Sequence, residues 1–153
     1  MKLDTIEYRE TAFKYATSLA KKHTSELGFL PFPAYEAALD ENRLWLQYEN
    51  DEPCGYLLFG MPNRRVIHVT QTVIQTDARR IKNATQLITN LKAVGAKHHA
   101  DRIVLRCAAD LDANHFWIAN GFSMVRSTDE GNKRDRLINL YVIDLPTAQK
   151  RLF

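Results

Sequence analysis

The chain has 153 residues, of which 45% are hydrophobic and 25% charged, and these values are ordinary for one globular domain with its own core. The net charge of +3 permits an anionic ligand or a nucleic acid but requires neither. No apolar run approaches the ~20 residues of a membrane span, and residues 1–10 do not have the character of a signal peptide. Cys54 and Cys107 lie far apart, each in a predicted strand, so we expect two buried thiols in a reducing compartment. The sequence thus predicts a single-domain cytoplasmic protein with no membrane partner.

The first part of the chain predicts two helices. Asp4 and Glu7 fit a capping box, and apolar residues follow at roughly helical spacing until Gly28, which ends this helix. Pro33 then starts a short second helix over residues 33–42 (PAYEAALDEN).

The rest of the chain predicts strands and helices in alternation. Strands over 43–49 and 54–60 form a hairpin around the turn at 50–53. The elements that follow are a strand over 66–74, a helix over 79–98, a strand over 102–107, a helix over 113–119, and strands over 122–127 and 137–145. The order ααβββαβαββ has a β–α–β unit between antiparallel hairpins, and it predicts an α/β (α+β) fold with a mixed sheet.

The junction between the strand over 66–74 and the helix over 79–98 predicts an anion site. The first turn of a helix has free backbone N–H groups and the positive end of the macrodipole. Arg79, Arg80 and Lys82 are unfavourable for the dipole at this end, and a phosphate bound at the turn would explain them. The sequence therefore predicts a phosphorylated ligand here.

Two motifs in this arrangement resemble those of the GNAT family of N-acetyltransferases. Residues 79–84 (RRIKNA) are similar to the family's pyrophosphate loop, Gln/Arg-x-x-Gly-x-Gly/Ala, with Lys82 in place of the central Gly. Residues 113–122 (ANHFWIANGF) are similar to Ala-x-x-x-aromatic-x-x-x-Gly-Phe. The resemblance runs from the first helix to the last strand. It implies one GNAT-like domain over residues 1–153, with a mostly antiparallel sheet, a central splayed pair of parallel strands and helices on both faces.

The resemblance implies acetyl-CoA as the acyl donor, bound between the splayed strands over 66–74 and 102–107. Its pantetheine would pair with the backbone of the first strand, and its pyrophosphate would meet backbone N–H groups from Arg80 to Thr85. Glycine at position 82 would allow a closer approach, but lysine fits if its φ is helical, and its side chain can then fold over the phosphates. The cofactor-binding residues implied in this way are Thr72, Ile74, Thr76, Arg79, Arg80, Ile81, Lys82, Asn83, Ala84, Thr85, Asn114 and Trp117. No metal is implied, because the pair His98-His99 has no third ligand at a usual spacing.

The reaction implied by the resemblance is direct attack of an amine on the thioester in a ternary complex, helped by a general base. Family members place a Glu six residues before the last apolar residue of the first splayed strand, and this position is His68. Alternation would put His68 on the strand face of Thr70, Thr72 and Ile74, and an imidazole pKa near ~6.5 suits a base. The alternative for His68 is a half-buried strand histidine with a hydrogen-bond partner.

The family's proton donor to the leaving thiolate is a Tyr four residues before the Gly-Phe pair, and here this position is Trp117. An indole N–H donates a hydrogen bond but no proton at neutral pH. Trp117 would therefore pack against the cofactor or belong to the core, while water or another group protonates the thiolate. Asp110 stands where the family often has an Asn that contacts CoA, and Asn114 is a second candidate.

The acceptor is not identified by the sequence. Arg64-Arg65 and Arg134-Asp135-Arg136 would suit an acidic or phosphorylated acceptor, although a solvated surface is the favoured explanation. Two other functions stay open: a GNAT-like enzyme that modifies nucleic acid or aminoacyl-tRNA, and a degenerate module that binds CoA without catalysis. The expected partners are acetyl-CoA and an amine. A nucleic acid is not favoured, and the resemblance allows a homodimer.

Overall fold

The computed structural model describes residues 6–23, 30–128 and 137–146. From the second predicted helix onward it confirms the predicted order, and each boundary lies within about two residues of the expected one. α1 ends at Lys22, whereas the predicted capping residue Asp4 and the predicted helix end at Gly28 lie outside the described residues. The helices and strands are α1 (Ile6–Lys22), α3 (Phe32–Asp40), β1 (Leu44–Glu49), β2 (Glu52–Phe59), β3 (Val66–Val73), α4 (Ile81–Lys97), β4 (Arg102–Ala108), α5 (Ala113–Ala119), β5 (Ser123–Thr128) and β6 (Ile138–Asp144).

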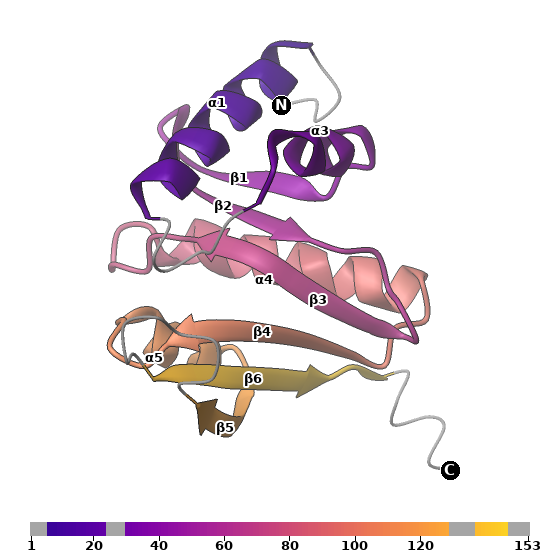
Figure 1. Ribbon diagram of the computed structural model, residues 1–153. Coiled ribbons are helices and arrows are strands. Elements are labelled where there is room, and N and C mark those ends of the chain that lie inside the picture. The colour runs from indigo at the N-terminus through magenta and orange to yellow at the C-terminus, as the bar shows by residue number, and fades with distance from the viewer. Residues whose placement is uncertain (1–5, 24–29, 129–136, 147–153) are drawn as a thin grey trace.

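The strands form one six-stranded sheet in the order β1-β2-β3-β4-β6-β5 (Figure 1). Neighbouring strands are antiparallel except for β3 and β4, which are parallel. The parallel pairing ends at His68 and Val104, although both strands continue beyond these residues. β3 and β4 then diverge, so the predicted splayed pair in a mixed, mostly antiparallel sheet is confirmed.

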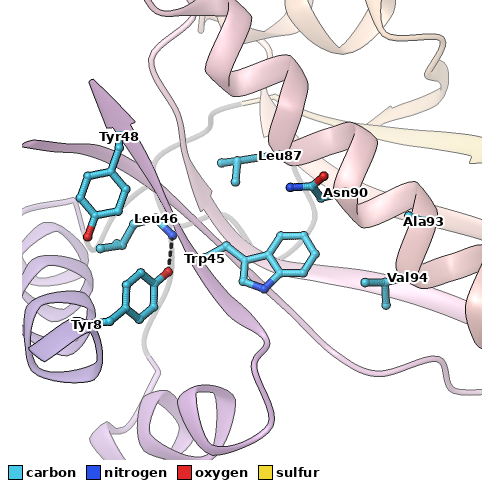
Figure 2. Close-up of a pocket in the computed structure, with 8 residues that line it drawn as sticks. All are labelled: Tyr8, Trp45, Leu46, Tyr48, Leu87, Asn90, Ala93 and Val94. Carbon is cyan, nitrogen blue, oxygen red and sulfur yellow. Dashed lines mark hydrogen bonds between the residues drawn. The ribbon is translucent and has the colours of Figure 1, made fainter. Parts of the chain in front are cut away.

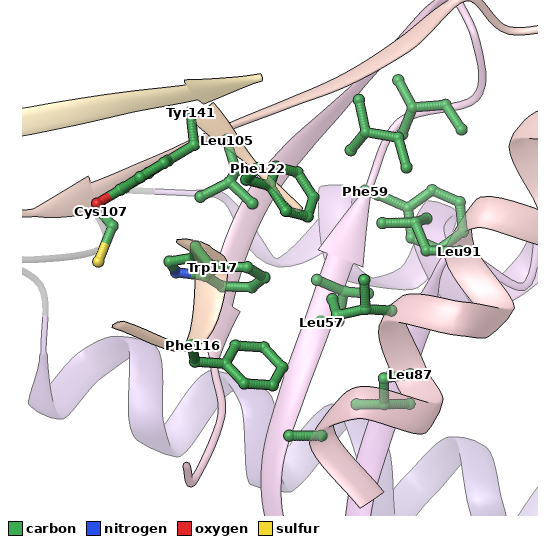
Figure 3. Close-up of a cluster of buried hydrophobic side chains, with 14 of the residues drawn as sticks. Leu57, Phe59, Leu87, Leu91, Leu105, Cys107, Phe116, Trp117, Phe122 and Tyr141 are labelled. Carbon is green, nitrogen blue, oxygen red and sulfur yellow. The ribbon is translucent and has the colours of Figure 1, made fainter. Parts of the chain in front are cut away.

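Helices cover both faces of the sheet, as predicted. α4 buries an apolar stripe at helical spacing, which includes Ala84, Leu87 and Leu91. This stripe and the aromatic residues of α5 share one core with the middle strands (Figure 3). A second core lies on the other face of β1 and β2, beneath α1 and α3. Its larger buried side chains are Tyr8, Tyr35, Leu39, Leu44, Leu46, Tyr56 and Leu58.

The two cysteines differ in burial. Cys107 is buried, but Cys54 is only partly buried, and both thiols are free. The expectation of two buried thiols therefore holds for Cys107 alone. Within the described ranges, no helix has the length and the apolar character needed to cross a bilayer.

β3 contains a bulge at Thr70. Leu58 of β2 pairs with Gln71, but the next residue of β2, Phe59, pairs with Val69. Thr70 is therefore one extra residue on β3. A bulge of this kind breaks the regular alternation of side chains between the two faces of a strand.

Before the bulge, His68 points away from α4. Its neighbours Ile67 and Val69 both pack in the core beneath that helix. Since successive side chains of a strand point to opposite faces, His68 lies on the other face of the sheet, where it is exposed.

After the bulge, the order of the faces is reversed. Ile74 packs in the core beneath α4, and Thr72 pairs with Leu57, which belongs to the same core. The prediction that His68 shares a strand face with Thr72 and Ile74 is therefore wrong, because the alternation does not continue through Thr70.

Candidate functional site

The first turn of α4 has two backbone N–H groups without an acceptor among the described residues. The carbonyl of Asp77 accepts hydrogen bonds from the N–H groups of Arg80 (3.0 Å) and Ile81 (2.9 Å). The N–H groups of Lys82 and Asn83 have no acceptor among the residues that the structure describes. They lie in the first turn of a 17-residue helix, where the macrodipole favours an anion. Of the predicted pyrophosphate donors from Arg80 to Thr85, these two are therefore the best placed to bind a phosphate.

The two arginines of this turn are paired with carboxylates. Arg79 Nε lies 2.7 Å from Glu49 Oε1, and Arg80 Nε lies 2.5 Å from Glu49 Oε2. Arg80 also contacts Asp77 Oδ2 at 2.9 Å, and its hydrogen bond lowers the pKa of Asp77. These contacts tie the turn to the end of β1, so a bound phosphate is not required to explain Arg79 and Arg80. Lys82 is exposed and has a helical backbone, which is the condition under which lysine can replace glycine at this position.

Gln47 of β1 forms hydrogen bonds with both ends of the turn between β3 and α4. Its side chain is 1% exposed. Its Oε1 accepts a hydrogen bond from the Gln75 N–H (2.7 Å), and its Nε2 donates to the Gln75 carbonyl (2.9 Å) and to Asn83 Oδ1 (2.6 Å). Nε2 also lies 3.2 Å from the Arg80 carbonyl. One buried amide thus joins the end of β3 to the first turn of α4.

Asn83 and Gly55 complete this arrangement. The Asn83 side-chain amide donates to the Tyr48 carbonyl on β1. A Cβ at position 55 would lie 2.5 Å from Gln47 Oε1 and 2.4 Å from the Val73 carbonyl oxygen, so only glycine leaves room for the Gln47 side chain. Sequence reasoning missed both Gln47 and Gly55, because no local pattern distinguishes them from other strand residues.

Two buried polar atoms near the splayed strands have no hydrogen-bond partner among the described residues. They are Thr72 Oγ1 on β3 and Trp117 Nε1 on α5. A buried polar group without a partner costs about 1–3 kcal/mol. Such atoms therefore suit a ligand that supplies the missing hydrogen bonds.

Trp117 is part of the core. It is 1% exposed and makes edge-to-face contacts with Phe116 and Phe122, at ring-centroid distances of 5.1 and 5.6 Å (Figure 3). The alternative that Trp117 is a core residue is thus confirmed, while its contact with a cofactor stays a prediction.

The Asn114 side-chain amide makes four hydrogen bonds inside the protein. Its Nδ2 donates to the carbonyls of Ala108 (2.8 Å) and Leu111 (2.6 Å). Its Oδ1 accepts from Asn139 Nδ2 (2.9 Å) and from the Tyr141 hydroxyl (2.6 Å). Asn114 therefore joins the end of β4 to α5 and β6. Its contact with CoA stays a prediction, and it would require one of these hydrogen bonds to be exchanged.

His68 lies where the two parallel strands separate. It is exposed, and its side chain has no hydrogen bond or ion pair with any described residue. The alternative of a half-buried histidine with a partner is therefore wrong. Its role as a base stays a prediction.

The other predicted positions are less informative. Ile74 and Thr76 follow β3 and are partly buried, and Thr85 is exposed on α4. Arg64 and Arg65 are exposed, whereas the segment 134–136 lies outside the described residues. No group of three or more metal-ligating side chains occurs in the described part of the chain, which includes His98 and His99.

A cavity of about 430 Å³ lies away from these residues (Figure 2). It is bounded by α1, β1 and α4. The Leu46 N–H donates to the Tyr8 hydroxyl at its edge (3.0 Å), and burial raises the pKa of Tyr8 to about 12. None of the predicted site residues lines this cavity. The residues that do are Tyr8, Trp45, Leu46, Tyr48, Leu87, Asn90, Ala93 and Val94.

Comparison with known proteins places the chain in a family. The family model of the acetyltransferase (GNAT) domain matches residues 27–135. No curated protein sequence matches the chain. Among solved structures, the NatC complex bound to Gag peptide and CoA has a TM-score of 0.72 at 15% identity, with 95% of each chain covered.

Two further solved structures are similar over most of their length. The aminoglycoside 6'-N-acetyltransferase from Enterococcus faecium has a TM-score of 0.70 at 12% identity, with 94% of each chain covered. YncA from Salmonella typhimurium, whose structure contains its cofactor acetyl-CoA, has a TM-score of 0.69 at 15% identity, with 88% of this chain and 87% of that chain covered. These identities show a common fold. Together with the family model, they show that the chain belongs to the GNAT acetyltransferase family.

Proposed function

We propose that the protein is an acetyl-CoA-dependent N-acetyltransferase in which an amine attacks the thioester directly in a ternary complex. The observation that carries this proposal is the separation of β3 and β4 after the pair His68–Val104, above a helix start with two available N–H donors. The solved relative from Salmonella typhimurium, which contains acetyl-CoA, supports the choice of donor.

The residues present fit an acyl-CoA. The N–H groups of Lys82 and Asn83 would donate hydrogen bonds to the pyrophosphate, and the Lys82 ammonium would add a positive charge beside it. A pantetheine arm contains amide groups that both donate and accept hydrogen bonds, so it can satisfy Thr72 Oγ1 and Trp117 Nε1. The bound thioester would supply the activated acyl group.

The two substrates would approach from opposite faces of the sheet. Thr72 and Trp117 belong to the side covered by α4 and α5, whereas His68 is exposed on the other side. His68 would take the proton from the amine, directly or through one water, because it lies at the point where the strands separate. Trp117 would donate a hydrogen bond and leave proton transfer to water or to another group.

One alternative function has specific support. Lys82 in place of glycine and Trp117 in place of tyrosine both favour a degenerate module that binds CoA without catalysis. An enzyme that acts on nucleic acid or aminoacyl-tRNA remains the less favoured candidate, because no described contact is particular to a nucleic acid.

Amine-dependent release of CoA separates the enzyme from the module. Acetyl-CoA would be incubated with a panel of primary amines, and free CoA would be measured by chromatography. We expect turnover with at least one amine. His68→Ala should lower kcat by about 10²-fold or more, with unchanged affinity for acetyl-CoA. Tight binding of acetyl-CoA without turnover of any amine would support the module instead.

A further inference from the structure

One half of the sheet has a face that no described helix covers. α4 and α5 pack against the opposite face of β3, β4 and β6, and α1 and α3 lie over β1 and β2 (Figure 1). The near face of β4, β6 and β5 in Figure 1 therefore faces outward. This is also the face on which His68 is exposed.

The strand register brings two arginines together on this face. Leu105 and Cys107 of β4 are buried in the core beneath α5, so Arg106 between them points outward. Arg106 pairs with Leu140 of β6, and Leu140 pairs with Arg126 of β5. The two arginines thus flank Leu140 in one row, with their Cα atoms roughly 10 Å apart at the usual strand spacing.

Neither arginine has an ionic partner among the described residues. Arg106 and Arg126 are both exposed, and neither side chain forms a hydrogen bond or an ion pair there. Arg102, by contrast, lies 3.9 Å from Asp144 at the other end of β4. Among the described residues of β4, β5 and β6 on this face, the unpaired positive charge therefore lies at the end where β3 and β4 have separated.

This charge lies beside the proposed site of reaction. His68 and Val104 form the last parallel pair, and Arg106 is the next residue of β4 on the same face. It lies roughly 7 Å along the strand from Val104. Val104, Leu140 and Val142 are partly buried and give the face an apolar centre between the charges.

We propose that this face binds the acceptor, and that the acceptor is an amine whose own framework carries carboxylate groups. Arg106 and Arg126 are then its specificity-determining residues, since a guanidinium pairs with a carboxylate through two parallel hydrogen bonds. The inference rests on the proposed acetyltransferase function. A polycationic acceptor such as an aminoglycoside would instead meet two unbalanced positive charges.

Binding of matched peptides tests the proposal. Three tetrapeptide amides share an N-terminal Ala and a C-terminal Tyr and differ only in a central pair of Glu, Gln or Arg. Each is titrated calorimetrically into the protein saturated with CoA, which fills the donor site without turnover. We expect the Glu peptide to bind about tenfold tighter than the Gln peptide, and the Arg peptide to bind weakest.

Variants show whether the two arginines cause this preference. Arg106→Ala and Arg126→Ala should each reduce the Glu-to-Gln preference several-fold, and Arg106→Lys should restore part of it. Lys97→Ala removes one positive charge from the end of α4 and should leave the preference unchanged. The affinity of each variant for CoA alone should equal that of the wild type.

Three results would overturn the inference. They are equal binding of the Glu and Gln peptides, a preference that survives in both arginine variants, and tighter binding of a single-stranded oligonucleotide than of the Glu peptide. Failure of CoA itself to bind would contradict the proposed function instead. In that case the same peptide series on the protein alone still tests the charged face.

Discussion

Gln47 forms a pair of hydrogen bonds with the backbone of Gln75, through its Oε1 at 2.7 Å and its Nε2 at 2.9 Å. The same Nε2 reaches Asn83 in the first turn of α4. A side chain on β1 therefore fixes the position of a turn that belongs to β3 and α4. This relationship connects the β1–β2 hairpin to the proposed pyrophosphate site.

Replacing Gln47 should weaken acetyl-CoA binding, and the loss should come only from the contacts with the pyrophosphate. Gln47→Leu removes the hydrogen bonds that hold the turn, so the Lys82 and Asn83 donors lose their fixed position. We expect the affinity for acetyl-CoA to fall about tenfold, the equivalent of roughly 1.4 kcal/mol. S-acetylpantetheine lacks the pyrophosphate, and its affinity should not change.

The control for this prediction is Gln86→Leu, which removes an exposed glutamine from α4, the helix whose first turn Gln47 contacts. It should leave both affinities unchanged. Equal losses of affinity for acetyl-CoA and S-acetylpantetheine in Gln47→Leu would mean that Gln47 stabilises the fold without positioning the turn.

Gly55 and Gly60 on and beside β2 should respond very differently to alanine. A Cβ at Gly55 would lie 2.4 Å from the Val73 carbonyl oxygen, whereas a Cβ at Gly60 would have its nearest neighbour, the His68 carbonyl oxygen, at 3.9 Å. Gly55→Ala should lower the free energy of unfolding by about 1–3 kcal/mol or more. Gly60→Ala should change it by less than about 0.5 kcal/mol. Urea denaturation of both variants measures the difference, and equal effects would show that Gly55 is not closely packed.

Thr72→Val should change the stability of the protein and its affinity for acetyl-CoA in opposite directions. The substitution keeps the shape of the side chain and removes the buried hydroxyl that lacks a partner. The free energy of unfolding should rise by about 1 kcal/mol, while the affinity for acetyl-CoA should fall. Urea denaturation and calorimetric titration measure the two quantities.

The matched control is Thr70→Val, at the exposed bulge of β3. It should affect neither quantity strongly. A Thr72→Val variant that is less stable than the wild type and binds acetyl-CoA equally well would contradict a role for this hydroxyl in the donor site.

The stability of the protein should fall at alkaline pH in a way that depends on Tyr8. Burial raises the pKa of Tyr8 from 10.0 to about 12. Because the pKa is higher in the folded state, the stabilisation is complete below pH ~10 and is lost as the pH rises towards ~12.

Tyr8→Phe tests this pH dependence. At pH 7 the variant should be less stable by about 1 kcal/mol, because the Leu46 N–H loses its acceptor. Between pH 9 and 11 the difference should shrink by on the order of 1 kcal/mol, since only the wild type has this tyrosine to ionise on unfolding. A difference that is constant over this range would rule out Tyr8 as the titrating group.

The element order was predictable because its signals are local. Asn50 and Asp51 both have positive φ in the turn of the β1–β2 hairpin, and Gly121 has a φ of 92° just after α5. Polar and glycine residues at such positions mark turns in a sequence without any knowledge of the fold. The motif from Arg79 to Ala84 could be predicted for the same reason, since it is contiguous, and the structure places it at the start of α4.

The parts of the site that were missed depend on contacts between distant segments. Gln47 lies 28 residues from Gln75 and 36 from Asn83, and nothing near it in the sequence marks its role. The bulge at Thr70 has no local signature, so counting by two from Ile74 assigned His68 to the wrong face. Glu49 likewise has no sequence feature that connects it to Arg79 and Arg80.

The most direct test of a donor site at the start of α4 is a calorimetric titration of acetyl-CoA into the wild type, Lys82→Glu and the control Lys97→Glu. Lys82 is the suitable probe because Arg80 is already paired with Glu49 and Asp77. We expect micromolar binding to the wild type and to Lys97→Glu, and loss of binding in Lys82→Glu. Absence of binding at millimolar acetyl-CoA, or equal binding to all three proteins, would contradict a donor site at the start of α4.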